Sequence, residues 1–272
     1  GSTDVLIVSR RSAYFHFDRS CFLCSASAFL FEKECDADAF LALRLAPPEA
    51  AAALASSVNP PDENAIEEAV KLKEQGSATE TVAVTIGDDK SQDVLRTSMA
   101  MGIDRSILVK SSNTLEPLAV AKTLVKIIEK ENPDLVLLGK QAIDDDSNQT
   151  GQILSALMNW PQGCFISELK IEDNKLLISR EIDEGIEKLE TSLPAVLTCD
   201  LRLNTPRFAS LPNIMKAKKK PLDIIEIDTL GIDTESKIKV LNVVEPPKRE
   251  AGIMVSDVRE LVQKLKYEAK VI

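Results

Sequence analysis

The sequence lacks the features that would assign it to a membrane, secreted or nucleic-acid-binding class. No apolar stretch in its 272 residues approaches the length of a membrane span, which predicts no membrane insertion. The five cysteines are odd in number and lack the spacing of a disulfide framework, which favours a reducing compartment. The formal net charge of -10 argues against nucleic acid as a partner.

Metal-binding and phosphate-loop signatures are also scarce. The chain has one histidine, His16, and one Cys-x-x-Cys pair, Cys21 and Cys24, with no second pair of ligands beside it. We therefore predict no metal site and interpret these cysteines as structural. Neither a Walker motif nor a GxGxxG fingerprint is present, so a bound nucleotide would need another kind of loop.

What the sequence does contain is a regular alternation of apolar runs and amphipathic stretches. Short apolar runs predict strands at 5–8, 81–86, 107–109, 135–138 and 195–199, and helical spacing predicts helices at 62–73, 92–101, 118–130 and 153–160. This order predicts an α/β fold in which helices flank a mostly parallel twisted sheet, as in adenine-nucleotide-binding proteins of the universal-stress type.

Other segments interrupt or extend this alternation. Residues 170–190 predict an antiparallel hairpin, because two alternating runs are joined by Asp-Glu-Gly. We expect a domain over 1–221, in which 12–57 is an atypical, aromatic and Ala-rich segment. We expect residues 222–272 to form a C-terminal arm that reaches a partner. Its pattern predicts strands at 223–227 and 238–244 and a helix at 256–267.

The stretch 134–152 is where we expect a ligand. A buried strand stops at Gly139, a polar loop follows, and a helix begins after Thr150. The carboxyl ends of parallel strands and the N-termini of the following helices converge there with unpaired N–H groups. Asn148, Gln149, Thr150 and the backbone at Gly151 would donate to a phosphate, which favours a nucleotide. Mg²⁺ at the carboxylates of residues 144–146, or a solvated loop that only caps the helix, remain alternative interpretations.

A second loop, residues 200–220, predicts a protein-docking element. It carries two prolines, several apolar side chains and a basic end, and apolar anchors contribute affinity while charges guide encounter. The predicted anchors are Leu211, Pro212, Ile214 and Met215. The alternative is a helix that packs on its own domain.

Long motifs in these regions resemble the beta subunit of electron-transfer flavoprotein. In the order and spacing of that family, they are Asn59-Pro60 with AIEEAVKLKE, RTSMAMGIDR, DLVLLGKQAIDDDSNQTGQ, WPQG and DLRLNTPRFASLPNIMKAKKKP. The resemblance runs from about Val58 to the C-terminus. Segment 12–57 departs from the family's basic hairpin, and Pro61 stands where an aromatic residue is expected.

The resemblance implies an electron carrier without bond-making catalysis of its own, and hence without catalytic residues. It implies a heterodimer with an alpha subunit, FAD at the interface and a structural AMP. Acyl-CoA and related dehydrogenases would deliver electrons from fatty acid beta-oxidation and amino acid catabolism, and electron-transfer flavoprotein-quinone oxidoreductase would receive them. The compartment would be the mitochondrial matrix, or the cytoplasm of a bacterium.

The resemblance also implies site residues. Tyr14 would approach the flavin, and Leu211 would enter an apolar pocket of a dehydrogenase. The implied AMP contacts are Val8, Asn59, Pro60, Pro61, Asp62, Ile86, Gly139, Lys140, Gln141, Ala142, Ile143, Asp144, Asp145, Asp146, Ser147, Asn148, Gln149 and Thr150.

Two other classes stay open at this point. A nucleotide hydrolase or adenylating enzyme would need a glycine loop after the first strand, where the chain has Ser-Arg-Arg-Ser at 9–12. An adenine-nucleotide sensor of the universal-stress type, without electron transfer, would have no use for the docking loop or the C-terminal arm.

Overall fold

The computed structural model describes residues 3–8, 11–13, 56–113, 115–143, 146–172, 174–239, 241–242, 252 and 254–272. The chain divides into two compact units, Gly1–Lys239 and Val240–Ile272. The first unit extends past the expected boundary at 221, because strand β11 (Leu222–Glu226) pairs with β5 (Arg105–Lys110) and so belongs to the main sheet.

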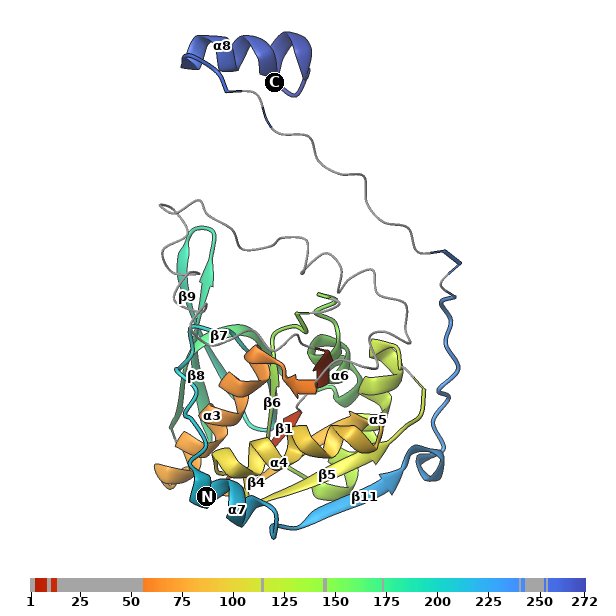
Figure 1. Cartoon of the computed structure of the whole chain (residues 1–272). Helices are drawn as coiled ribbons and strands as arrows, with labels where there is room; N and C mark the ends of the chain where they lie inside the picture. Colours follow the sequence, from red (N-terminus) through yellow and green to blue (C-terminus); the bar gives the residue numbers. More distant parts are fainter. Residues whose placement is uncertain are drawn as a thin grey trace. The chain divides into compact units, whose positions relative to one another are not determined.

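The first unit is built on a nine-stranded sheet with the order β11-β5-β4-β1-β6-β10-β7-β8-β9 (Figure 1). Neighbouring strands from β11 to β7 are parallel, whereas β7, β8 and β9 pair in antiparallel fashion. The predicted mostly parallel α/β fold is confirmed. The remaining strands are β1 (Thr3–Val8), β4 (Ala78–Gly87), β6 (Leu135–Gly139), β7 (Gln162–Glu172), β8 (Lys175–Ile182), β9 (Gly185–Ser192) and β10 (Ala195–Cys199).

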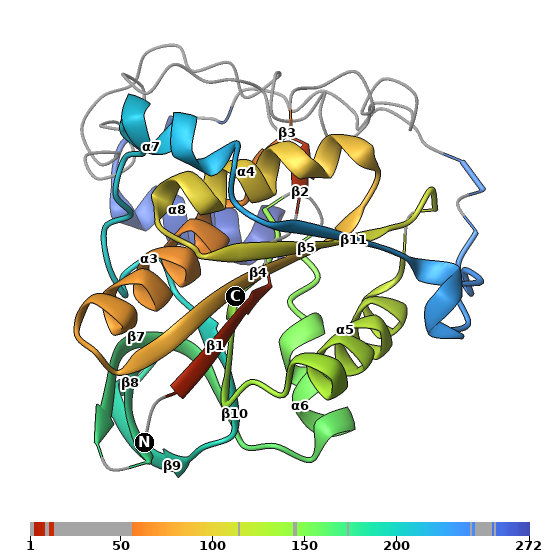
Figure 2. The same ribbon diagram turned by 90° about the horizontal axis from the view of Figure 1, so that it is seen from below.

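Helices cover both faces of the sheet (Figure 2). Helices α3 (Pro60–Glu74) and α4 (Gln92–Met101) pack on one face, and α5 (Pro117–Glu131) and α6 (Thr150–Met158) on the other. Each face has its own hydrophobic cluster, so alternate residues of one strand are buried on opposite sides. This explains why the central strands are continuous apolar runs in the sequence.

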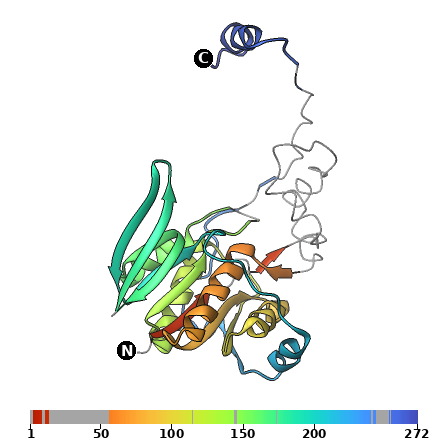
Figure 3. The same cartoon turned by 90° about the vertical axis from the view of Figure 1, so that its left-hand side faces the viewer.

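The antiparallel part of the sheet extends away from the parallel part as a long hairpin (Figure 3). The hairpin of β8 and β9 was predicted, but β7 was missed. β7 pairs with β10 in parallel and with β8 in antiparallel fashion. Its ladder with β8 is irregular between Ile166 and Glu168, and Phe165, just before, has a φ of 59°. These irregularities break the simple alternation that identifies a strand.

The atypical segment begins and ends at a small ladder. Strand β2 (Arg11–Ala13) pairs with β3 (Ser56–Val58) in antiparallel fashion, so the chain leaves and returns at one place. Residues 14–55 lie outside the described residues, and with them the calls on Tyr14, His16 and the Cys21–Cys24 pair.

The remaining elements are short. They are the 3₁₀ turns Asp89–Ser91 and Ile227–Leu230, helix α7 (Leu211–Ala217) and, in the second unit, α8 (Val258–Gln263) with a π-helical turn at Lys264–Glu268. The strand predicted at 238–244 is wrong at its described positions, which have no regular structure. Ile238 is 73% exposed, so it lacks the buried face that a strand pattern assumes. In the described part of the chain, no helix is long and apolar enough to cross a bilayer.

Candidate functional site

The candidate site lies where the winding of the sheet reverses. From β1 the chain adds β4 and β5 on one side, and then places β6 on the other side of β1. The carboxyl ends of β1 and β6 therefore border a crevice, which is where open α/β sheets bind ligands. Val8 ends the first of these strands and Gly139 ends the second.

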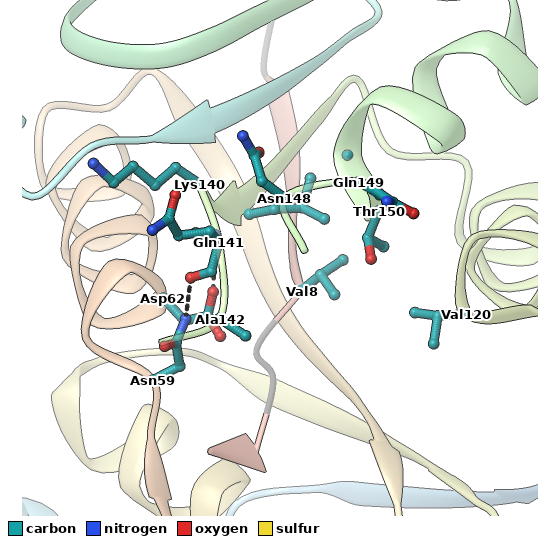
Figure 4. A pocket seen from close by; sticks show the side chains of 13 residues that line it. Val8, Asn59, Asp62, Val120, Lys140, Gln141, Ala142, Asn148, Gln149 and Thr150 are labelled. Carbon is teal, nitrogen blue, oxygen red and sulfur yellow. Dashed lines mark hydrogen bonds between the residues drawn. The ribbon is translucent and has the colours of Figure 1, made fainter. Parts of the chain in front are cut away.

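A hollow opens at this crevice (Figure 4). Its enclosed volume is about 50 Å³, and its empty volume is about 480 Å³ when the open mouth is counted. Val120 and Leu138 line it without having been predicted, and Gly151, whose backbone was expected beside the phosphate, lines it as well. The predicted residues that line it are Val8, Asn59, Asp62, Gly139, Lys140, Gln141, Ala142, Asn148, Gln149 and Thr150.

Other predicted residues do not line the hollow. Ile86 packs into the core beneath α5, and Asp146 accepts a hydrogen bond from the side chain of Gln141. Asp144 and Asp145 lie outside the described residues. The described residues that the structure leaves off the lining are Pro60, Pro61, Ile86, Ile143, Asp146 and Ser147.

Two buried side chains at the start of α3 hold the loop after β6. Asn59 Nδ2 donates to the carbonyl of Gln141 at 2.9 Å, and Asn59 Oδ1 accepts from the amide of Ile143 at 3.3 Å. Asp62 Oδ1 accepts from the amide of Gly139 at 2.8 Å. The sequence predicted both side chains as ligand contacts, whereas these bonds also make them supports of the loop that forms the hollow.

Lys140 joins this loop to the end of β10. Its Nζ lies 2.8 Å from Oδ2 of Asp200, and its amide donates to the carbonyl of Cys199 at 3.0 Å. Burial acts to raise the pKa of Asp200, but hydrogen bonds from Lys140 and from the amide of Arg202 outweigh it and hold the pKa below its usual value. Asp200 is therefore ionised at neutral pH and compensates the charge of Lys140.

The N-terminus of α6 faces the hollow without a side-chain cap. Gln149 is the N-cap residue and makes no capping hydrogen bond, and Asn148 before it has a left-handed φ of 49°. Gln152 Nε2 donates to Asn148 Oδ1 at 3.0 Å and so holds this turn. The first N–H groups of a helix have no acceptor within the helix and carry the positive end of its dipole, so this end of the hollow suits an anion.

The docking segment, residues 200–220, combines a fixed base with an exposed tip. Ala217 of α7 is buried and α7 packs on α4, so the helix does contact its own domain. Leu211 is nevertheless 79% exposed and Met215 62% exposed, and Pro212 and Ile214 are exposed beside them. The predicted anchors are thus available to a partner.

The fold and the hollow together define an α/β protein with a candidate ligand site at the switch point of its sheet. Comparison with known families gives a closer assignment. The model of the electron transfer flavoprotein domain matches residues 50–230. The chain is 54% identical over 216 residues to electron transfer flavoprotein subunit beta of Bradyrhizobium diazoefficiens, covering 79% of this chain and 87% of that protein.

Eukaryotic relatives are similarly close. The mitochondrial subunit beta of Oryza sativa subsp. japonica is 52% identical over 225 residues, covering 81% of this chain and 89% of that protein. The subunit beta of Homo sapiens is 52% identical over 214 residues, covering 77% and 84% respectively. The chain belongs to the family of electron transfer flavoprotein beta subunits, which confirms the resemblance and implies that a flavin takes part in its function.

Proposed function

We propose that this chain is the beta half of a heterodimeric electron carrier. It pairs with an alpha subunit, binds AMP as a structural ligand in the hollow, and contributes to an FAD site at the subunit interface. The observation that carries the nucleotide part is the uncapped N-terminus of α6 at the hollow. Family membership and the exposed docking segment favour this function over a nucleotide hydrolase or a universal-stress sensor.

The chemistry of the hollow fits a nucleoside monophosphate. Asn148, Gln149 and Thr150 would hold the phosphate at the helix N-terminus, and the apolar walls at Val8 and Val120 would contact the rest of the ligand. Ligand pockets usually measure about 300–1,000 Å³. The enclosed 50 Å³ is smaller, so a mononucleotide would occupy the open mouth of the hollow as well.

The electron-transfer part of the proposal concerns surfaces. A bound flavin supplies the redox chemistry, and this chain supplies position and electrostatics. The alpha subunit would hold most of the FAD. Acyl-CoA and related dehydrogenases would dock at Leu211, Pro212, Ile214 and Met215, and electron-transfer flavoprotein-quinone oxidoreductase would be the acceptor. The compartment would be the mitochondrial matrix or a bacterial cytoplasm, as the names and sources of the relatives suggest.

A charge substitution at Thr150 tests the nucleotide site. Thr150→Glu puts a carboxylate where the phosphate would bind, yet a carboxylate in the first helical turn favours the helix, so folding should be preserved. Thr150→Gln is the matched control of nearly equal size. Each variant is co-purified with the alpha subunit, and AMP and FAD are extracted under denaturing conditions and quantified by chromatography.

We expect stoichiometric AMP and FAD from the wild type, and also from Thr150→Gln, because glutamine keeps the backbone N–H and offers a side-chain donor in place of the hydroxyl. Thr150→Glu should retain FAD but bind AMP at least about tenfold more weakly. The new carboxylate and the phosphate would be close neighbours in a partly buried site, where like charges about 4 Å apart repel by several kcal/mol. Equal AMP retention in the two variants would contradict a phosphate at this helix end. A wild-type heterodimer without AMP would overturn the nucleotide proposal.

A further inference from the structure

One face of α3 holds the base of the docking segment through a set of four side chains, which we call the clamp: Asn64, Glu67, Asn204 and Arg207. Arg207 Nε lies 2.8 Å from Glu67 Oε2, and Arg207 Nη2 lies 3.1 Å from Glu67 Oε1. The backbone amide of Arg207 also donates to Glu67 Oε2, at 3.1 Å. Glu67 therefore fixes both the side chain and the main chain of the docking segment.

Further hydrogen bonds and an ion pair strengthen the clamp. Asn64 Nδ2 donates to the carbonyl of Asn204 at 2.7 Å, and Asn204 Nδ2 donates back to the carbonyl of Asn64 at 3.0 Å. Arg207 also reaches Glu74, one end of its guanidinium lying 2.6 Å from Glu74 Oε1. The Glu67 side chain is only 4% exposed, so the guanidinium of Arg207 takes the place of water as its hydrogen-bond partner.

The far end of the docking segment is held as well. Arg96 of α4 donates to the carbonyls of Ala217 and Lys220 at 2.7 and 2.8 Å. Lys220 Nζ donates to the carbonyl of Met99 at 3.0 Å. Between these two fixed ends, Leu211 is exposed at the start of α7.

We propose that Glu67 and Arg207 are positioning residues for docking, which rests on the docking role proposed above. The clamp fixes the base of the segment before a partner arrives, so Leu211 is presented in one arrangement. Ordering a flexible loop on binding costs affinity, and a loop already ordered avoids that cost. The guanidinium fork suits this task, because a planar bidentate pair fixes orientation as well as distance.

The test compares two arginines with similar bonds and different places. Arg207→Gln breaks the clamp. The matched control is Arg105→Gln, since Arg105 forks onto Glu80 at 3.0 Å and reaches Glu131 at 2.6 Å, both outside the docking segment. Each heterodimer is assayed as electron acceptor of an acyl-CoA dehydrogenase, and KM, kcat, FAD content and thermal stability are measured. Leu211→Ala and Arg207→Lys complete the set.

We expect Arg207→Gln to raise KM about tenfold with kcat within about twofold of wild type, an effect the size of one lost interaction with a charged group. Both Arg207→Gln and Arg105→Gln should lower the thermal stability, to a similar extent, but Arg105→Gln should leave KM unchanged. Arg207→Lys should have a KM between those of wild type and Arg207→Gln. The lysine still pairs with Glu67, but a point charge cannot reproduce the bidentate fork.

The outcomes separate the clamp from the docking role. An equal rise in KM for Arg207→Gln and Arg105→Gln overturns the positioning role and leaves only a general effect of stability. If Leu211→Ala leaves KM unchanged, the docking role itself is wrong. A raised KM for Leu211→Ala beside a wild-type KM for Arg207→Gln refutes the clamp alone.

Discussion

Replacing Gly151 with alanine tests how closely α6 must approach the sheet at the hollow. A Cβ at this position would lie 2.5 Å from Cγ2 of Thr198, and the next atom, Cδ1 of Leu138, is 3.8 Å away. Thr198 is 2% exposed on β10, so its methyl group has little space into which to move. A single overlap of two methyl groups is therefore the expected defect.

The size of the effect follows from two opposing terms. Overpacking a buried site costs about 1–3 kcal/mol, and alanine is favoured over glycine in a helix by about 1 kcal/mol. We expect Gly151→Ala to lower the free energy of unfolding by the difference, about 0–2 kcal/mol. Thr198→Ser should cost about 1 kcal/mol for a lost methyl group, while keeping the hydroxyl that accepts from the amide of Phe165 at 3.0 Å.

The double variant should be close to wild type, because the alanine methyl group occupies the space that the threonine methyl group leaves. This corresponds to a coupling energy of about 1–3 kcal/mol between the two positions. Urea titrations followed by far-UV circular dichroism measure it, at one protein concentration and with AMP in constant excess, since ligands and partners shift apparent stability. A coupling energy below about 0.5 kcal/mol would refute the proposed overlap.

Two further predictions concern the loop after β6 and an acidic group elsewhere. In Gly139→Ala the new Cβ would lie 2.7 Å from the backbone nitrogen of Asp62, so we expect a loss of about 2–4 kcal/mol and of bound AMP. The control is Gly252→Ala, whose new Cβ would have no atom within 4 Å. Its free energy of unfolding, measured in the same urea titration, should stay within about 0.5 kcal/mol of wild type. Equal stability of the two variants would contradict the predicted clash at Gly139. Burial acts to raise the pKa of Asp104, but hydrogen bonds from Lys73 and Thr81 hold it below its usual value. The stabilisation by the ionised Asp104 carboxylate is therefore present above about pH 4 and is lost as the pH falls below that value. The difference in unfolding free energy between wild type and Asp104→Asn should be smaller at about pH 3 than at about pH 6. An equal difference at both pH values would contradict this role of Asp104.

Local patterns were sufficient to predict most elements and the general place of the site. The apolar run at 135–138 and the helix after Thr150 are short-range signals, since burial on both faces and helical periodicity depend on neighbouring residues. The rule that ligands bind at the carboxyl ends of parallel strands then located the loop between them. The docking segment was predicted from apolar side chains beside lysines, and the family resemblance then named Leu211 as its anchor.

The family resemblance added what local patterns do not contain. Asn59 and Asp62 were assigned to the nucleotide pocket only through the matching motifs, and the structure brings both to the hollow. Their hydrogen bonds to Gln141 and Gly139 connect residues far apart in the chain. No periodicity predicts such pairs, because each partner alone looks like an ordinary polar residue at a helix start or in a loop.

The sequence by itself determined most of the strands and helices and the polar loop after the strand at 135–138, because these depend on contacts between near neighbours. Only the tertiary structure decided that β6 lies beside β1, that Val120 from α5 reaches the hollow, and that Glu67 pairs with Arg207. These arrangements depend on how separate helices and strands pack against one another. Packing is a property of the whole sheet and its two covered faces, and no single segment of the chain encodes it.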